Sequence, residues 1–313
     1  MAGYLARRGL QAVGVLLGVS VLVFAIIHLV PGDPVRLALG TRFDQETYEA
    51  LRQRAGLDQP LVLQYFDWIG RALTGDLGVS FRSGRTVMSM IVERLPATLS
   101  LAAAAIVVAL LIALPLGTLS AVRQGSKLDY AATTFSQAGI SIPDFWMGIL
   151  LILFFSLQLD LLPPSGYVSV LESPWGWFTH LLMPAVTVGV VSGSILTRFV
   201  RSSVLESLGE DFTRTARSKG LRERRVIRRH VLRNALVPVV TVTGLQLAYL
   251  LSGVVVVEAV FAWPGLGRLA LDAVLARDYP VLQGAVLLFA LFFLLVNLTV
   301  DVLYAFLDPR IRY

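Results

Sequence analysis

The sequence contains no cysteine among its 313 residues, and only 15% of the residues are charged. The absence of cysteine excludes disulfides, thiolate metal sites and cysteine nucleophiles. A soluble domain carries about a quarter of its residues as charged side chains. The shortage of charge, together with a hydrophobic content of 56%, therefore points to a membrane protein.

Motifs that would carry enzymatic chemistry are also missing. No HExxH pair occurs, and the three histidines lie in separate segments, so a zinc site is not expected. No GxSxG elbow is present. No GxxxxGK followed by Ser or Thr is present either, so any ATP must bind to another subunit. These absences disfavour two alternatives, an intramembrane enzyme and a non-transport scaffold.

Six stretches are apolar and long enough to cross about 30 Å of hydrocarbon as helices. They cover residues of about 10–30, 98–122, 131–159, 181–197, 235–257 and 281–300. The first stretch follows Arg7 and Arg8 but lacks a small-residue cleavage site before Pro31, so it is interpreted as an uncleaved span. The predicted fold class is an all-α integral membrane protein with six transmembrane helices.

Charge in the connecting loops predicts the orientation of these spans. Residues 198–233 contain eleven basic and four acidic side chains, which places this loop and both termini in the cytoplasm. Residues 160–180 contain no lysine or arginine, as expected of an outer loop. Residues 31–97 contain eight arginines, a contrary signal. Eight acidic residues accompany them, and long loops translocate with little regard to charge.

The segment 31–97 is predicted to be a small extracytoplasmic helical insertion. Asp44 can cap a short helix that stops at Gly56, and Leu61–Leu73 repeats apolar residues at helical spacing. An aromatic cluster in the second helix either docks a partner or marks the lipid interface. It consists of Tyr65, Phe66 and Trp68.

The basic loop contains the sequence DFTRTARSKGLRERRVIRRHVLRNALVP, which predicts two short helices joined at Gly220. The alternative is a plain stop-transfer cluster of arginines. Apolar residues at helical spacing among the charges favour a folded projection that another protein can grip. They are Phe212, Ala216, Leu221, Val226, Ile227, Val231 and Leu232.

A series of short motifs completes the pattern along the chain. They are PGDP (31–34), GLDQPL (56–61), GDLG (75–78), RLPATL (94–99), WPGLGRL (263–269), DYP (278–280) and DPRIR (308–312). With these motifs around six spans, the chain resembles permease subunits of binding-protein-dependent ABC importers of the dipeptide, oligopeptide and nickel class. The EAA triplet of such permeases falls by position on Arg214, Thr215 and Ala216, with its glycine at Gly220. Only Ala216 and Gly220 keep the general pattern.

The resemblance implies an importer-type ABC permease fold in a bacterial or archaeal inner membrane. It divides the chain into residues 1–30 with the first span, the insertion 31–97, a five-helix core 98–304 and a cytoplasmic tail 305–313. A coupling loop, residues 201–234, lies in the core and contacts an ATPase. The coupling residues are Arg214, Thr215, Ala216, Lys219, Gly220 and Leu221. No catalytic, cofactor-binding or metal-binding residue is expected.

The implied partners are a second permease subunit, related but distinct, two ABC ATPase subunits that bind ATP and Mg, and an extracytoplasmic substrate-binding protein. No nucleic acid is expected. The chain would supply half of a pathway for di- or oligopeptides. A nickel or glutathione importer is an alternative, as is a stand-alone secondary transporter driven by an ion gradient, which the basic loop disfavours.

Two acids are predicted to face the pathway, because a carboxylate against lipid is costly. They are Asp144 and Glu258. The alternatives are that Asp144 lies at a helix end near the cytoplasmic boundary and that Glu258 lies in the membrane interface.

Overall fold

A computed structural model describes residues 2–29, 32–33, 35–36, 44–54 and 56–307. Part of the PGDP motif, the DPRIR motif and most of the predicted tail 305–313 therefore lie outside the described residues. The regular structure of the described residues is helical, apart from one isolated antiparallel bridge between Val79 and Thr86. The chain forms two compact units, the first from residues 1–98 and 264–295 and the second from residues 99–263 and 296–312.

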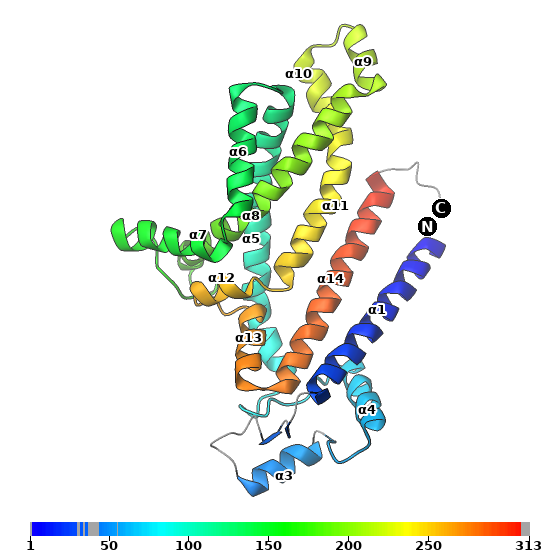
Figure 1. The fold of residues 1–313 in the computed structure, drawn as a ribbon, viewed down its shortest axis with the longest axis vertical. Helices are drawn as coiled ribbons and strands as arrows, with labels where there is room; N and C mark the ends of the chain where they lie inside the picture. Colours follow the sequence, from blue (N-terminus) through cyan, green and yellow to red (C-terminus); the bar gives the residue numbers. More distant parts are fainter. Residues whose placement is uncertain (1, 30–31, 34, 37–43, 55, 308–313) are drawn as a thin grey trace. The chain divides into compact units, whose positions relative to one another are not determined.

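Long apolar helices dominate both units (Figure 1). Five stretches of the described residues are long and apolar enough to cross a membrane, and a bent pair of helices makes a sixth when it is counted as one span. The helices that carry them are α1 (Ala2–Leu29), α5 (Val87–Val122), the bent pair α6 (Lys127–Ser141) and α7 (Asp144–Leu151), α8 (Pro174–Gly209), α11 (Leu232–Leu251) and α14 (Tyr279–Leu307). The prediction of a multi-pass all-α membrane protein is confirmed.

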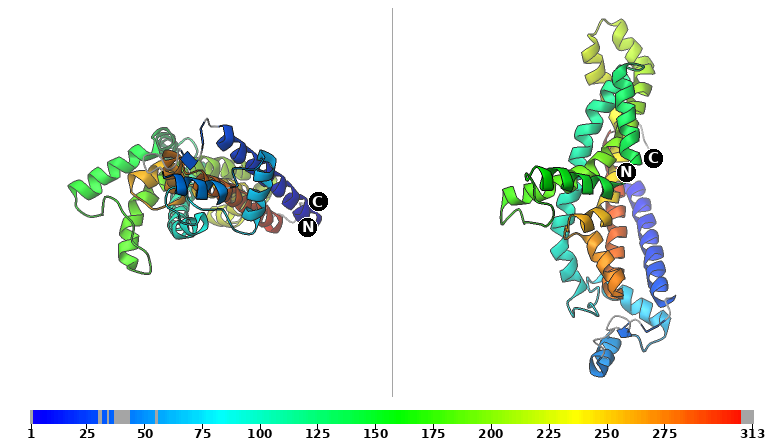
Figure 2. Two further views of the ribbon diagram at one scale, coloured as in Figure 1. Left: turned by 90° about the horizontal axis from the view of Figure 1, so that it is seen from below. Right: turned by 60° about the vertical axis from the view of Figure 1, so that its left-hand side comes forward.

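The predicted span 131–159 corresponds to a sharply bent pair of helices. α6 and the following helix, α7 continued by the π-helix η2 (Ile152–Gln158), are bent by 99° at the break between them. α7 leads away sideways from the end of α6 in Figure 1, and Figure 2 gives two further views of the fold. The cause is Pro143, because the residue before a proline avoids the helical region, and Ile142 is extended with φ −86° and ψ 124°.

The predicted span 235–257 also ends early. α11 stops at Leu251, and the chain turns at Gly253 with a φ of +88°. A left-handed glycine is a common end of a helix, because it lacks the Cβ that would clash. The remaining residues form a separate short helix, α12 (Val255–Val260).

Small residues let the helices of the second unit pack closely around α8. A Cβ placed on Gly189 would lie 2.7 Å from the Cβ of Val108, and one on Gly193 would lie 3.1 Å from the backbone of Ala109. On α6, a Cβ on Gly139 would lie 2.0 Å from Ser194 Oγ. Close approach of this kind drives helix association in lipid, where burial of apolar surface gives no advantage.

In the first unit, α4 (Leu61–Leu73) packs on α1 through polar and aromatic contacts. Ser20 Oγ lies 2.8 Å from the Tyr65 hydroxyl, and His28 Nε2 lies 3.1 Å from Gln64 Oε1. Within the predicted aromatic cluster, Tyr65 and Trp68 both contact the Phe24 ring of α1. Phe66 is 63% exposed, so it is the member of the cluster that faces outward.

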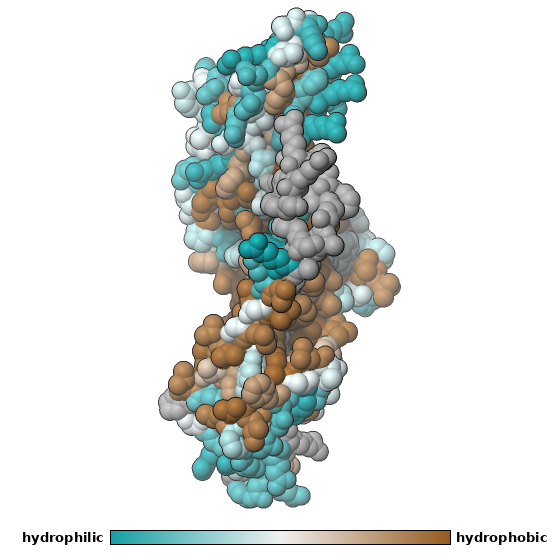
Figure 3. Space-filling view, turned by 90° about the vertical axis from the view of Figure 1, so that its right-hand side faces the viewer, coloured by the Kyte–Doolittle hydropathy of each residue, from teal (hydrophilic) through white to brown (hydrophobic). Residues whose placement is uncertain are grey.

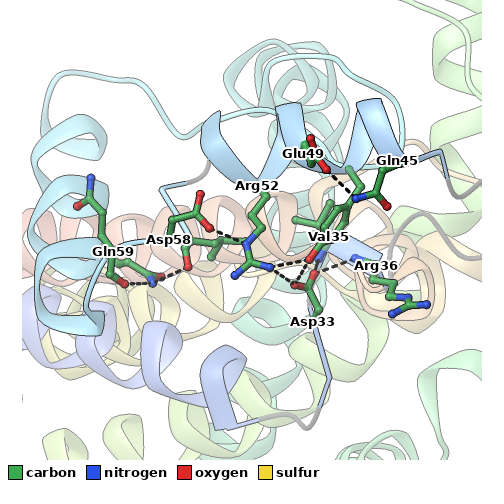
Figure 4. Close-up of polar contacts among 11 residues, drawn as sticks. Asp33, Val35, Arg36, Gln45, Glu49, Arg52, Asp58 and Gln59 are labelled. Atoms are coloured by element: carbon green, nitrogen blue, oxygen red, sulfur yellow. Dashed lines mark hydrogen bonds and ion pairs between the residues drawn. The ribbon is translucent and has the colours of Figure 1, made fainter.

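Helix α3 (Gln45–Arg54) begins as predicted, with the Asp44 carboxylate accepting the Thr47 N–H at 2.9 Å. A polar cluster connects it to Asp33 and Asp58 (Figure 4). Arg52 Nε donates to Asp58 at 2.7 Å, and the Tyr48 hydroxyl donates to Asp33 at 2.8 Å. Burial alone would raise the pKa of Asp33, but hydrogen bonds from the Arg36 N–H and Tyr48 hold it below its usual value.

The contact between α6 and α8 leads to a stability prediction. We expect Gly139→Val to lower the midpoint of thermal unfolding in detergent, because overpacking costs about 1–3 kcal/mol. Gly14→Val on α1 is the matched control, since nothing lies within 4 Å of a Cβ at that position. Circular dichroism on both variants tests the expectation, and an equal midpoint for the two would contradict it.

Candidate functional site

The basic loop folds as a helix–turn–helix at the end of the second unit. α8 has 36 residues, about 54 Å at 1.5 Å per residue, and so exceeds the roughly 30 Å of a hydrocarbon core. It is followed by α9 (Asp211–Ser218), α10 (Glu223–Val226) and the π-helix η3 (Ile227–Val231), which leads into α11. We call residues 211–231 the basic helix–turn–helix. Hydrophilic side chains gather over this end, beyond the hydrophobic spans (Figure 3).

Gly220 forms the turn, as predicted. Its φ is +71°, and its N–H donates to the Arg217 carbonyl at 2.9 Å. Nothing lies within 4 Å of a Cβ built at this position. The requirement for glycine is therefore one of backbone conformation and not of space.

One face of α9 is anchored in the apolar core of the unit. Thr213 is buried, and its hydroxyl donates to the Ser207 carbonyl of α8 at 2.7 Å. Ala216 is 5% exposed and belongs to one apolar cluster with Val226 and Val231. Val200 and Val204 of α8 belong to the same cluster. The helix–turn–helix is thus continuous with the packing between α8 and α11.

The opposite face is solvated and basic. Arg214, Thr215, Lys219 and Gly220 are exposed, and Leu221 is half-buried. Ala216, the remaining predicted coupling residue, is buried in the apolar cluster. Arg217 Nη2 donates to Glu223 at 2.7 Å and so connects α9 with α10 across the turn.

The two predicted pathway acids occupy different settings. Asp144 is the first residue of α7, half-exposed at the break after α6, where its Oδ1 accepts the Phe145 N–H at 2.8 Å. It therefore lies at a helix end and not inside a continuous span. Glu258 is 1% exposed in the short helix α12, beyond the end of α11. Its burial within the protein satisfies the requirement that a carboxylate avoid lipid.

Sequence reasoning missed two buried carboxylates. Asp129 pairs with Arg201 in the second unit, although Arg201 was counted among the loop charges that set the orientation. In the first unit, Asp278 accepts hydrogen bonds from the Ser80 hydroxyl at 2.5 Å and the Phe81 N–H at 3.1 Å. Asp278 belongs to the DYP motif, but its partner Ser80 lies 198 residues away in the sequence, so the motif alone does not reveal the contact.

Two of the recognised motifs lie next to each other near Asp278. A Cβ on Gly78, the last residue of GDLG, would lie 4.0 Å from the Pro280 side chain of DYP. Burial raises the pKa of Asp278, and the hydrogen bonds from Ser80 and Phe81 partly offset this rise. GDLG and DYP are therefore neighbours at the start of α14.

Comparisons with known proteins match the whole length of this arrangement. The model of the family described as "Binding-protein-dependent transport system inner membrane component" matches residues 113–313, and the model of its N-terminal part matches residues 1–102. The chain belongs to this family. It is therefore an ABC importer permease subunit, and the predicted family is confirmed.

Curated relatives of this permease extend over its full length. It is 45% identical over 313 residues to the glutathione transport system permease protein GsiC of Escherichia coli O6:H1. It is 42% identical over 317 residues to the oligopeptide transport system permease protein AppB of Bacillus subtilis. Each match covers 100% of both chains. These relatives are named as permeases and not as enzymes.

Solved structures share the fold of the permease. An inward-facing form of the MetNI methionine ABC transporter matches with a TM-score of 0.58 at 20% identity, covering 71% of this chain and 97% of that chain. An amino acid ABC transporter matches with a TM-score of 0.52 at 16% identity, covering 71% and 94%. At these identities the match shows the fold alone, and it confirms the predicted importer-type architecture.

The raised pKa of Asp278 predicts a pH effect on the stability of this permease. A carboxyl whose pKa is higher in the folded state favours folding below its unfolded pKa of about 3.9, and this contribution is lost as the pH rises through the folded pKa. We therefore compare the thermal midpoints of wild type and Asp278→Asn. The stability advantage of wild type over the variant is expected to be larger near pH 4 than at pH 7. A difference that is constant with pH would contradict this assignment.

Proposed function

We propose that this permease forms half of the translocation pathway of an ATP-driven importer, and that the exposed face of its basic helix–turn–helix docks on a separate ATPase subunit. The observation that carries the proposal is a solvated, basic, folded projection whose inner face belongs to the same apolar cluster as α8 and α11. A push on this projection would move those helices as rigid bodies. An orientation signal alone would not need such a core.

The proposed partners follow from the chemistry that the chain lacks. Because the sequence has no phosphate-cradling loop, ATP and Mg are assigned to two separate ATPase subunits. A second permease subunit, related but distinct, would complete the pathway, and an extracytoplasmic binding protein would deliver the solute. The loop charges support a plasma-membrane orientation with both termini and the helix–turn–helix in the cytoplasm and residues 31–97 outside.

We propose short peptides as the solute, with glutathione as one possible member of that class. The relatives at 45% and 42% identity are named for glutathione and oligopeptides, and both names fit a solute with a peptide backbone. This similarity favours peptides over chelated nickel. Uptake of labelled di-, tri- and oligopeptides into cells that express the complete system tests the assignment, and uptake of nickel alone would contradict it.

The proposed orientation can be tested with single cysteines, because the chain has none of its own. We expect an impermeant maleimide added to intact cells to label Gln59→Cys, and to label Ser218→Cys only after the membrane is opened. Both positions are exposed. A photo-crosslinker attached at Ser218→Cys should capture the ATPase. Labelling of Ser218→Cys from outside would overturn the proposal.

The conformation of Gly220 predicts how coupling can be broken. Gly220→Val puts a β-branched residue in the left-handed region, where an ordinary side chain costs about 1–2 kcal/mol. We expect peptide uptake to fall about tenfold while the protein still inserts, since 1.4 kcal/mol corresponds to a factor of ten. Gly220→Asn is the matched control, because asparagine tolerates a positive φ. Equal uptake by the valine and asparagine variants would count against the role of the turn.

A further inference from the structure

A buried ion pair lies on the stem of the basic helix–turn–helix. Arg201 Nε donates to Asp129 Oδ1 at 2.8 Å, and Arg201 Nη2 donates to Oδ2 at 2.9 Å. This two-pronged geometry fixes direction as well as distance. The Asp129 side chain is 7% exposed and that of Arg201 is 30% exposed, so the pair is largely shielded from water.

Asp129 accepts hydrogen bonds from several segments of the chain. Besides Arg201 of α8, it accepts the Ser120 hydroxyl near the end of α5 and the Gly125 N–H of the connecting loop at 2.9 Å. Its own N–H donates to Ser126 Oγ, the N-cap of α6, at 3.3 Å. One carboxylate therefore connects α5, the α5–α6 loop, α6 and α8.

The position of Arg201 along α8 makes this connection relevant to coupling. Arg201 and the end of the helix at Gly209 belong to one uninterrupted helix. Its neighbours Val200 and Val204 pack in the apolar cluster that contains Ala216 of the helix–turn–helix. Only Glu210, where the chain is extended, separates the end of α8 from the start of α9.

The opposite side of α8 is connected differently. Ser203 donates to the Ala235 carbonyl of α11 at 2.7 Å, and the remaining contact there is apolar packing. Buried ion pairs are weak contributors to net stability, because desolvation offsets their attraction. A pair of apolar side chains could hold α6 against α8 equally well. What the ion pair adds is a contact with fixed geometry that resists sliding of one helix along the other.

We propose that Asp129 and Arg201 are positioning residues that lock the α5–α6 hairpin to the stem of the basic helix–turn–helix. A displacement of the helix–turn–helix then moves α5, α6 and α8 together, and not α8 alone. This inference rests on the proposed docking of the helix–turn–helix on an ATPase. The inference adds which contact would carry the movement of the helix–turn–helix to α5 and α6.

The first experiment measures peptide uptake per ATP hydrolysed by the complete transporter in proteoliposomes. We expect Asp129→Asn and Arg201→Gln to lower this ratio at least about fivefold, the lower end of typical coupling between sites. Arg201→Lys keeps the positive charge but loses the two-pronged hydrogen bonding of the guanidinium. We expect it to give an intermediate ratio of uptake to ATP hydrolysed. Glu93→Gln is the matched control, since it breaks an exposed ion pair with Arg85 in the first unit. A purely structural role would reduce the amount of assembled complex and leave the ratio unchanged.

The second experiment remains informative if one variant assembles poorly. Spin labels on Gln124→Cys and Ser218→Cys report the separation between the α5–α6 loop and α9, and this chain has no other cysteine. We expect ATP to leave this separation unchanged with the pair intact and to change it in Asp129→Asn or Arg201→Lys. An identical response of wild type and both variants, with unchanged uptake per ATP, would overturn the inference. A wild-type complex that lacks an ATPase would instead overturn the proposed function.

Discussion

A backbone N–H or C=O group left unpaired in hydrocarbon costs several kcal/mol, so a chain surrounded by lipid must satisfy these groups within each segment. The long helices of this permease follow from that constraint, and so does the importance of every place where a helix is interrupted. The interruptions coincide with residues that either remove a donor or permit an unusual φ. Pro143 separates α6 from α7, Gly253 ends α11, and Gly220 turns the basic helix–turn–helix.

Once the spans are rigid, their contacts decide what can move. α8 approaches α5 and α6 closely because positions 139, 189 and 193 are glycines. A side chain at any of these positions would collide with the adjacent helix. Close packing gives the helices a defined alignment but does not by itself prevent one from sliding along another. The ion pair of Asp129 and Arg201 supplies a directional contact at the end of α8 that leads to α9. Packing and polar contact thus play complementary parts on the same helix.

Much of this arrangement could be predicted from local pattern. Apolar length located the spans, and the Gly220 turn and the helices at 45–54 and 61–73 followed from capping and spacing. Pro143 marks the place of the bend after α6, but hydropathy stays high across it and does not report how sharply the chain turns. The contacts Asp129–Arg201 and Ser80–Asp278 could not be predicted, since 72 and 198 residues separate the partners and no periodicity relates them. Ala216 was listed as a coupling residue by motif position, which does not report that its side chain is buried on α9.

The exposed and buried halves of the basic helix–turn–helix are governed by different forces. Its shape depends on the conformation of Gly220 and on apolar contacts of Ala216, Val226 and Val231, none of which is screened by salt. The ion pair of Arg217 with Glu223 is solvated, and exposed pairs of this kind contribute about 0–1 kcal/mol. The proposed docking face carries the exposed cations Arg214 and Lys219, and the attraction of exposed cations to acidic groups falls as ionic strength rises. Under the proposed function, salt is expected to weaken the association with the ATPase and to leave the fold of the helix–turn–helix intact.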